Sequence, residues 1–393
     1  MTTQNKNAPA LRFPEFSGEW SEQILKEWIS EYRENSTENN QYVVLTSSNK
    51  GLMKQSDYYG ENRITERDNV GFNVIPNGYI TYRSRSDNRK FTFNLNNLGT
   101  TGIISVYYPV FTIKNGSNEF FVEYFNYHKH FLGKFSVGTS QQVLSLNDLR
   151  SIKLHIPSSE EQQKIAAFLM AVDEKIQQIA KKKHLLEQYK KGVMQKIFNQ
   201  EIRLKDNNGN DFPAWEEKKL GEAGEINPKN KELPQSFIYI DLESVENGVL
   251  QKENLIQLEN APSRAQRLLR KNDILFQTVR PYQKNNLYFD RDGVYVASTG
   301  YAQIRTKNNP QYLYQFLHSD NFVNEVILRC TGTGYPAINS TDLSNISISL
   351  PTIPEQQKIA DFLSGLDKKI NLVKEQLQKT QEYKKCLLQK MFI

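Results

Sequence analysis

Four short stretches of the sequence concentrate arginine, lysine, amide, serine and tyrosine side chains. They read SSNKGLMKQSDYY from Ser47, TYRSRSDNRK from Thr81, APSRAQRLLRKND from Ala261 and TVRPYQKNN from Thr278. In the major groove of DNA, arginine pairs with guanine, and asparagine or glutamine with adenine. Lysine and serine bind phosphates, which set register rather than sequence. We therefore expect these stretches to contact DNA; for each of them, a merely solvated polar loop is the alternative.

The individual DNA-contact candidates are chosen by side-chain type. They come from the four stretches, with one further tyrosine from the segment CTGTGYP. The predicted contacts are Ser48, Asn49, Lys50, Lys54, Tyr82, Arg83, Arg85, Arg89, Lys90, Arg264, Arg267, Arg280, Tyr282, Lys284, Asn285 and Tyr335.

No pattern of catalytic residues is found in the sequence. A GxxxxGK[ST] phosphate loop is missing, and the Asn-Pro pairs at Asn227 and Asn309 lack the second proline of an amino-methyltransferase site. His128 and His130 have no cysteine or acidic cluster beside them in the sequence, so we expect no metal site. The chain is therefore predicted to be non-catalytic and to hold no cofactor.

A long segment occurs twice and must position the polar loops. Residues 161–198 and 355–392 superpose without a gap at a shift of 194, and 17 of the 38 positions are identical. The leads containing Trp20 and Trp215 align at a shift of 195. The chain is thus a tandem duplication in which the regions between the shared segments align only at their edges.

Both shared segments carry the pattern of a long amphipathic helix. Each begins with a capping box, Ser158-x-x-Glu161 and Thr352-x-x-Glu355, and continues for about 38 residues, roughly 57 Å. Apolar residues recur at intervals of three and four, which is a coiled-coil seam. The predicted seam and subunit interface comprises Ile165, Leu169, Val172, Ile176, Ile179, Leu186, Ile359, Leu363, Leu366, Ile370, Val373 and Leu377.

Four polar residues interrupt this seam. They are Lys183, Lys190, Thr380 and Lys384, and we expect the seam to open there to helices of a partner. Because only a short stretch follows the first helix before the second variable region begins, the two helices are expected to pair antiparallel.

The variable regions read as compact mixed α/β domains with curved antiparallel sheet. Runs rich in β-branched and aromatic residues predict strands, among them 41–47, 73–84, 90–95, 102–113 and 119–125 in the first region. In the second region the predicted strands are 236–242, 273–280, 286–290, 293–298 and 301–306. A helical piece is expected at 310–329, with its counterpart near 119–133.

The predicted fold class is α+β, with two mixed α/β domains separated by an antiparallel coiled coil of two long helices in a pseudo-twofold tandem repeat. The predicted divisions are residues 1–157 and 199–351 for these domains, which the family resemblance given below identifies as target recognition domains, and 158–198 and 352–393 for the helices. No apolar run is long enough for a membrane span, and two cysteines give no disulfide framework, so we expect a cytoplasmic protein without membrane contact.

The twice-repeated EQQKIAxFL…DxKI…YKKxxxQKxF, together with FPEFSGEW and SRAQRLLRKNDILFQTVRP, resembles the specificity subunit of type I restriction–modification systems. This resemblance implies that each variable domain reads one half of a bipartite double-stranded DNA target and that the coiled coil sets the spacer. It further implies two docked modification subunits and two motor–nuclease subunits, which would hold S-adenosylmethionine, ATP and magnesium. The alternative is a non-catalytic coiled-coil scaffold with two ligand-binding domains.

Overall fold

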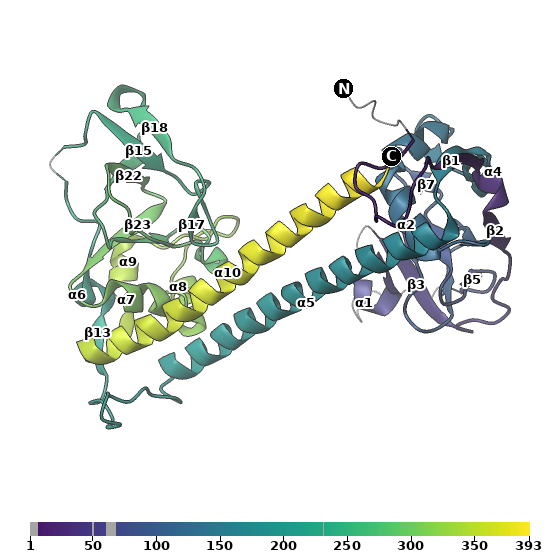
Figure 1. The fold of residues 1–393 in the computed structure, drawn as a ribbon. Helices are drawn as coiled ribbons and strands as arrows, with labels where there is room; N and C mark the ends of the chain where they lie inside the picture. The colour runs from purple at the N-terminus through teal and green to yellow at the C-terminus, as the bar shows by residue number, and fades with distance from the viewer. Residues whose placement is uncertain (1–6, 49–50, 60–67, 231) are drawn as a thin grey trace. The chain divides into compact units, whose positions relative to one another are not determined.

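The computed structural model describes residues 7–48, 51–59, 68–230 and 232–393 and divides into two compact units (Figure 1). Unit 1 consists of Met1–Ile179 and Gln376–Ile393, and unit 2 of Ala180–Glu375. The division falls within both long helices, so each unit is one variable domain with the adjoining halves of the two helices. No helix in the described residues is long and apolar enough to cross a membrane.

Unit 1 contains two four-stranded sheets. The first has the order β2-β10-β6-β8 and the second β4-β3-β9-β5, with β3 and β9 parallel. Two further strand pairs are antiparallel, β1 with β12 and β7 with β11. The strands are β1 (Ser21–Ile24), β2 (Ile29–Tyr32), β3 (Val43–Ser48), β4 (Gly51–Lys54), β5 (Asn73–Ile75), β6 (Ile80–Tyr82), β7 (Arg85–Ser86), β8 (Phe93–Leu95), β9 (Gly102–Ile104), β10 (Val110–Ile113), β11 (Gln142–Val143) and β12 (Lys153–Ile156).

Unit 2 repeats this topology. Its sheets have the orders β14-β23-β20-β21 and β18-β15-β22-β19, with β15 and β22 parallel, and β13 pairs with β24 as β1 does with β12. The strands are β13 (Glu216–Lys219), β14 (Gly224–Ile226), β15 (Ser236–Ile240), β16 (Val245–Glu246), β17 (Val249–Leu250), β18 (Asn254–Gln257), β19 (Ala265–Leu268), β20 (Ile274–Gln277), β21 (Leu287–Tyr288), β22 (Tyr295–Ser298), β23 (Tyr301–Thr306) and β24 (Ser347–Leu350). The duplication therefore extends through the variable domains, where the sequence alignment fails. The prediction of a purely antiparallel sheet is wrong, because each domain contains one parallel pair.

Shorter α-helices and 3-10 helices connect the strands of both units. In unit 1 they are η1 (Leu25–Glu27), α1 (Gln55–Tyr59), α2 (Asn118–Tyr127), α3 (Lys129–Leu132), η3 (Gly133–Phe135) and α4 (Leu146–Ser151). In unit 2 they are α6 (Leu220–Ala223), η4 (Leu258–Asn260), η5 (Pro281–Gln283), α7 (Pro310–Phe316), α8 (Asp320–Leu328) and α9 (Ser340–Ser344).

Helix α2 corrects the strand predicted at 119–125. Ser117 caps the helix by accepting a hydrogen bond from the amide of Phe120, and the buried Phe120, Phe121, Tyr124 and Phe125 lie at helical spacing. The helical piece predicted at 310–329 is two helices, because Ser319 caps the start of α8.

The two long helices are α5 (Ser159–Phe198) and α10 (Ile353–Met391), and within each unit they run antiparallel. In unit 1, Ile165 and Leu169 near the start of α5 share a core with Leu387 and Met391 at the end of α10. In unit 2, Ile197 at the end of α5 shares a core with residues near the start of α10, among them Ile359 and Leu363. Of the twelve predicted seam residues, Ile165, Leu169, Ile179, Ile359, Leu363, Leu366 and Val373 are buried, and the other five are half-buried.

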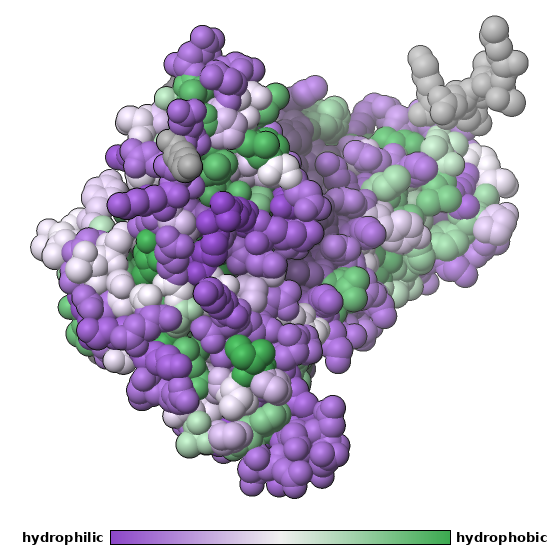
Figure 2. Space-filling model, turned by 90° about the vertical axis from the view of Figure 1, so that its left-hand side faces the viewer, coloured by the Kyte–Doolittle hydropathy of each residue, from purple (hydrophilic) through white to green (hydrophobic). Residues whose placement is uncertain are grey.

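The face of the molecule seen in Figure 2 is mostly hydrophilic, with hydrophobic residues in small separate patches. Among the described residues on this face, no broad apolar surface marks a membrane or obligate protein contact. Polar recognition is therefore the better expectation for this face.

Candidate nucleic-acid interface

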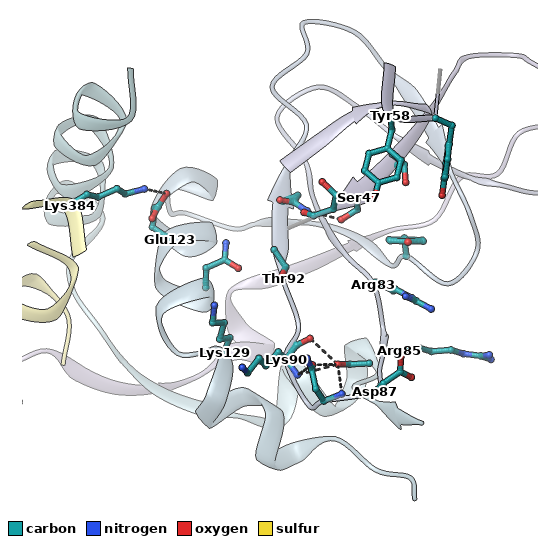
Figure 3. A pocket seen from close by; sticks show the side chains of 18 residues that line it. Ser47, Tyr58, Arg83, Arg85, Asp87, Lys90, Thr92, Glu123, Lys129 and Lys384 are labelled. Atoms are coloured by element: carbon teal, nitrogen blue, oxygen red, sulfur yellow. Dashed lines mark hydrogen bonds and ion pairs between the residues drawn. The ribbon is translucent and has the colours of Figure 1, made fainter. Parts of the chain in front are cut away.

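A polar groove of about 860 Å³ opens in unit 1 (Figure 3). Strand β3, helix α1, the loop after β6 and helix α2 contribute to its wall. Five cationic side chains line it: Arg83, Arg85, Lys90, Lys129 and Lys384. Lys384 is paired with Glu123 and Asp173. None of the other four forms an ion pair within the described part of the chain, so their charge is available to an anion.

Hydrogen bonds hold the polar loop of this groove in one conformation. The amide of Lys90 donates to the side chains of Ser86 and Asn88, each at 3.1 Å, and the hydroxyl of Ser86 donates to the Lys90 carbonyl at 3.0 Å. Across the groove, the amide group of Asn94 donates to the Ser47 hydroxyl at 2.7 Å. The loop is thus organised before any ligand binds, which reduces the entropy lost on binding.

An arginine stacks on an exposed tyrosine in each unit. In unit 1 the guanidinium of Arg85 lies over the ring of Tyr107, 4.1 Å from its centroid. In unit 2 the guanidinium of Arg280 lies over the ring of Tyr335 at 4.2 Å. Both arginines follow equivalent strands, β6 and β20. The sequence reading named three of these residues but missed Tyr107, because nothing local in the sequence pairs it with Arg85.

Of the remaining DNA-contact candidates in unit 1, some line the groove and others lie outside it. Ser48, Arg83 and Lys90 line the groove, whereas Lys54 and Arg89 are exposed outside it. Asn49 and Lys50 lie outside the described residues.

Tyr82 is a wrong prediction. Its side chain is fully buried, its hydroxyl donates to the Leu144 carbonyl at 2.9 Å, and burial raises its pKa well above the usual range. Tyr82 sits among Phe91, Phe93 and Phe111 as part of the core. All three residues of β6 are buried. Residue type alone does not show this, because tyrosine occurs both in cores and at exposed contact surfaces.

In unit 2, Arg264, Tyr282 and Tyr335 are exposed, whereas two other candidates hold a loop in place. Lys284 pairs with Asp320 at 2.5 Å and donates to the His318 carbonyl at 2.9 Å, and this pairing lowers the pKa of Asp320. The amide of Asn285 donates to the Val245 carbonyl at 2.5 Å. Both side chains, which are predicted to contact DNA, instead hold the loop around η5 in place.

Arg267 is half-buried on β19, and its Nε has no hydrogen-bond partner in the described residues. Burial lowers the pKa of this guanidinium. Arg267 lies opposite Ala297 on β22. The carbonyl of Arg264 accepts the amide of Thr299, and the amide of Thr278 in the Arg280 loop donates to the Gly300 carbonyl. Both basic loops of unit 2 are therefore attached to one turn at the same edge of the domain.

Lys190 and Lys384 interrupt the seam for a reason within the chain. Lys190 pairs with Asp367 at 2.6 Å in unit 2, and Lys384 pairs with Asp173 at 2.8 Å in unit 1. The two pairs are related by the shift of 194. Lys384 also binds Glu123 of α2 at 3.0 Å, and in unit 2 Gln315 of α7 donates to Asp367 at 2.7 Å. The prediction that the seam opens at Lys190 and Lys384 is wrong, because both make cross-helix ion pairs.

The other two interruptions are satisfied on their own helices. Lys183 pairs with Glu187 at 2.8 Å, and the Thr380 hydroxyl donates to the Gln376 carbonyl at 2.7 Å. Neither contact opens the seam.

The repeated Glu-Gln at each helix start fastens the helix to its domain. Glu161 is buried and accepts two hydrogen bonds from Arg12, at 2.7 and 2.6 Å. Glu355 is buried and accepts two from Arg203, at 3.2 and 2.7 Å, and one from Trp215 at 3.1 Å. The predicted capping boxes are therefore not complete.

Only the first helix start keeps its hydroxyl cap. Ser158 accepts the Glu161 amide at 3.3 Å, whereas the Thr352 hydroxyl has no partner in the described residues. Gln162 and Gln356 are also buried, and each accepts the amide of an N-cap residue, Ser117 of α2 or Asn309 of α7. These contacts account for the identity of the two segments at their beginnings.

The described residues contain no group of three or more histidine, cysteine, aspartate or glutamate side chains placed to hold a metal ion. Cys330 is half-buried and Cys386 exposed, and both are free thiols.

Comparison with known proteins gives one consistent family. The model of the type I restriction modification DNA specificity domain matches residues 25–188 and 214–382. The specificity subunit of the type I restriction enzyme MjaVIII from Methanocaldococcus jannaschii is 26% identical over 277 residues, covering 66% of this chain and 65% of the relative. The MjaIX subunit of the same organism is 24% identical, covering 84% and 81%.

The HindI specificity subunit from Haemophilus influenzae is 25% identical over 187 residues, covering 46% of this chain and 41% of the relative. The matches thus span less than two thirds of the MjaVIII and HindI subunits.

Solved structures show the same fold. The S subunit of a type I restriction–modification system from M. genitalium superposes with a TM-score of 0.62 at 15% identity, covering 98% of this chain and 99% of that one. A second structure, from work on complex assembly and conformational transition of the type I R-M system, gives 0.52 at 17%, covering 94% and 95%. With two matched regions that together span most of its length, the chain belongs to the family of type I restriction modification DNA specificity domains.

Proposed function

We propose that this chain is the DNA-reading subunit of a type I restriction–modification assembly, in which each variable domain binds one half of a bipartite duplex. The observation that carries the proposal is the groove of unit 1, where four of the five lining cations have no carboxylate partner in the described chain. Free cations of this kind bind phosphates, while the stacked arginine and the amide side chains beside them match base edges. The two domains share a topology but not their loops, as two different half-sites require.

The helix pair is proposed to set the spacer and to bind two copies of one partner. Among the 17 identical positions, the buried ones hold the fold, but several exposed ones make no repeated contact within the chain. Tyr189 and Tyr383 occupy the same repeat position, are 54% and 53% exposed, and make no ring contact among the described residues. The other exposed identities on the later part of each helix are Lys175 and Lys369, Lys191 and Lys385, Gln195 and Gln389, and Lys196 and Lys390.

An exposed tyrosine among lysines fits an apolar pocket with an acidic rim. Because the feature is present once on each helix, we infer two equal docking sites, for two modification subunits that would hold S-adenosylmethionine. Two motor–nuclease subunits with ATP and magnesium would complete the assembly, and this chain would contribute no catalytic group.

DNA binding by this chain in complex with its modification subunit is expected to depend steeply on salt. Each phosphate contact contributes roughly 0.9 to the slope of log K against log salt. Replacing Arg83, Lys90 and Lys129 together by alanine should therefore reduce the slope by up to about 2.7. Fluorescence anisotropy from roughly 50 to 300 mM salt, a range in which the Debye length shortens from about 14 to about 6 Å, measures this.

Lys114→Ala is the matched control, because Lys114 is an exposed cation of unit 1 that does not line the groove. It should leave the slope unchanged. Affinity that does not vary with salt would support the scaffold alternative and contradict DNA reading.

Substitution of one repeated tyrosine is expected to disrupt the binding of one modification subunit and leave the other bound. Tyr189→Ala should reduce the affinity of one of the two modification subunits for this chain by roughly 30-fold, the loss of about 2 kcal/mol typical of a hot-spot tyrosine. The double variant with Tyr383→Ala should weaken binding at both sites. Titration calorimetry measures how many modification subunits each variant still binds tightly. Leu372→Ala is the control, because Leu372 is 66% exposed on α10 but is not repeated on α5. Wild-type affinity at both sites in the double variant would rule out this surface.

A further inference from the structure

Arg85 and Arg280 are the arginines of the described residues whose guanidinium lies over an aromatic ring. Arg12, Arg203 and Arg305 are paired with buried glutamate or aspartate carboxylates. Arg33, Arg291 and Arg329 pair with carboxylates at the surface. Arg85 and Arg280 have no such partner, and each instead lies over a tyrosine ring that is itself exposed, Tyr107 by 47% and Tyr335 by 68%.

Each arginine loop is bonded to the backbone that carries its tyrosine. In unit 1 the amide of Ser84, next to Arg85, donates to the Tyr107 carbonyl at 3.0 Å. In unit 2 the amide of Arg280 donates to the carbonyl of Pro336, the residue after Tyr335, at 2.7 Å. Two segments far apart in the sequence are thus joined in the same manner in both units. The arrangement thus occurs once in each unit, although the two tyrosines come from loops that are not equivalent in the repeat.

The backbone of Arg280 adds a second observation. Its φ is +54°, in the left-handed region that residues other than glycine seldom adopt. The Arg280 loop is fixed in this conformation by the bond to Pro336 and by the bridge between Val279 and Ala337. Residues held in such a conformation by their surroundings occur most often at functional sites.

A guanidinium held against a tyrosine face keeps the donors at its edge directed outward in one plane. Two parallel N–H groups in a plane match two ligands in DNA, the O6 and N7 acceptors of guanine and two oxygens of a phosphate. Stacking also removes much of the freedom of the long side chain before binding, which favours a contact that must discriminate. The unstacked Arg83 and Lys90 of the same groove are better suited to phosphates.

We propose that Arg85 reads a guanine in one half-site and Arg280 a guanine in the other, each oriented by its stacked tyrosine. This proposal rests on the proposed function, since it assigns a base to sites already inferred to bind DNA. It makes Tyr107 and Tyr335 positioning residues, and it requires at least one G·C pair in each half of the target.

Substitution of 7-deazaguanine, which lacks only the N7 acceptor, tests the proposal. The target is first identified by methylation sequencing, and each guanine in a duplex is then replaced in turn. Binding by the complex of this chain with its modification subunit should fall about 10-fold at one guanine per half-site, the loss of one of the two hydrogen bonds of a bidentate contact. Arg85→Ala should abolish the sensitivity in one half-site and preserve it in the other, and Arg280→Ala should do the reverse.

The tyrosines supply a matched pair of variants. Tyr107→Phe keeps a ring for stacking and should retain the discrimination, whereas Tyr107→Ala should lose most of it while salt-dependent binding persists. Far-ultraviolet circular dichroism verifies that the variants are folded.

The possible outcomes distinguish failure of this base assignment from failure of the proposed function on which it rests. If wild-type complex binds no duplex in a salt-dependent manner, the proposed function fails. If it binds its target but either half-site lacks guanine, or the arginine variants lose affinity equally for every duplex, the arginines contact phosphates or nothing, and the base assignment is overturned.

Discussion

Glu355→Ala is expected to destabilise unit 2 by about 3–5 kcal/mol, the usual cost of removing one partner from a buried ion pair. The Glu355 carboxylate is fully buried and accepts hydrogen bonds from Arg203 and from the indole of Trp215. Without it, the guanidinium of Arg203 keeps only its hydrogen bond to the Pro213 carbonyl, and the half-buried indole N–H of Trp215 loses its partner. The first turn of α10 would then lose its attachment to the lead segment of its domain.

Urea unfolding followed by tryptophan fluorescence measures this effect. Glu161→Ala should cost a similar amount in unit 1, because Glu161 is equally buried against Arg12. Glu375→Ala is the control, an exposed carboxylate of the same helix. A loss below about 1 kcal/mol for Glu355→Ala, the value of an ordinary surface change, would show that the pair does not hold the helix to its domain.

Lys384→Leu is expected to destabilise the protein far more than Lys190→Leu, although the two lysines are equivalent in the repeat. Removing Lys384 leaves Glu123 and Asp173 facing each other, both less than half exposed, at an expected cost of about 3 kcal/mol. Removing Lys190 leaves Asp367, which is 38% exposed and keeps the hydrogen bond from Gln315, at a cost of about 1 kcal/mol. The difference arises because α2 supplies a carboxylate where α7 supplies an amide.

The deficit of Lys384→Leu should grow with pH. Burial raises the pKa of Glu123 above 4.5, Lys384 opposes this shift, and Asp173 adds to it. A carboxyl with a raised folded-state pKa contributes stability that is fully present below its unfolded pKa and is lost as pH rises through the folded one. Without Lys384 the pKa of Glu123 rises further, so the loss should begin near pH 4.5 and continue upward.

Urea midpoints between pH 4 and 8 measure the profile. Adding Glu123→Gln, which reproduces the arrangement of unit 2, should remove most of the pH dependence. A deficit that is constant across this range would show that the carboxylates are already separated by water.

The long helices were predictable because their signals are local and occur twice. The heptad spacing and the acidic first turns place α5 and α10 within about two residues of their observed ends. The same local reasoning misread Lys190 and Lys384, since their partners lie on the other helix, and Glu161 and Glu355, whose arginines come from outside the helix. Each of these errors concerns a polar residue whose partner is distant in sequence.

The variable domains were predictable as strands but not as sheets. Most strand runs are observed, yet the parallel pairs β3 with β9 and β15 with β22 depend on contacts across more than 50 residues. The segment of helix α2 is predicted both as a strand at 119–125 and as a helical piece near 119–133, because its aromatic residues favour strands while their spacing is helical. Among the DNA-contact candidates, residue type alone could not separate buried Tyr82 from exposed Arg83, nor find Tyr107.

The most direct test is methylation sequencing of a strain carrying this chain and its modification subunit, compared with a strain in which residues 224–349 come from another family member. We expect a bipartite methylated motif with a spacer of fixed length, and the exchange should change one half of the motif and leave the other half intact. Absence of any bipartite motif, or a change in both halves after the exchange, would contradict the account of two independent DNA-reading domains.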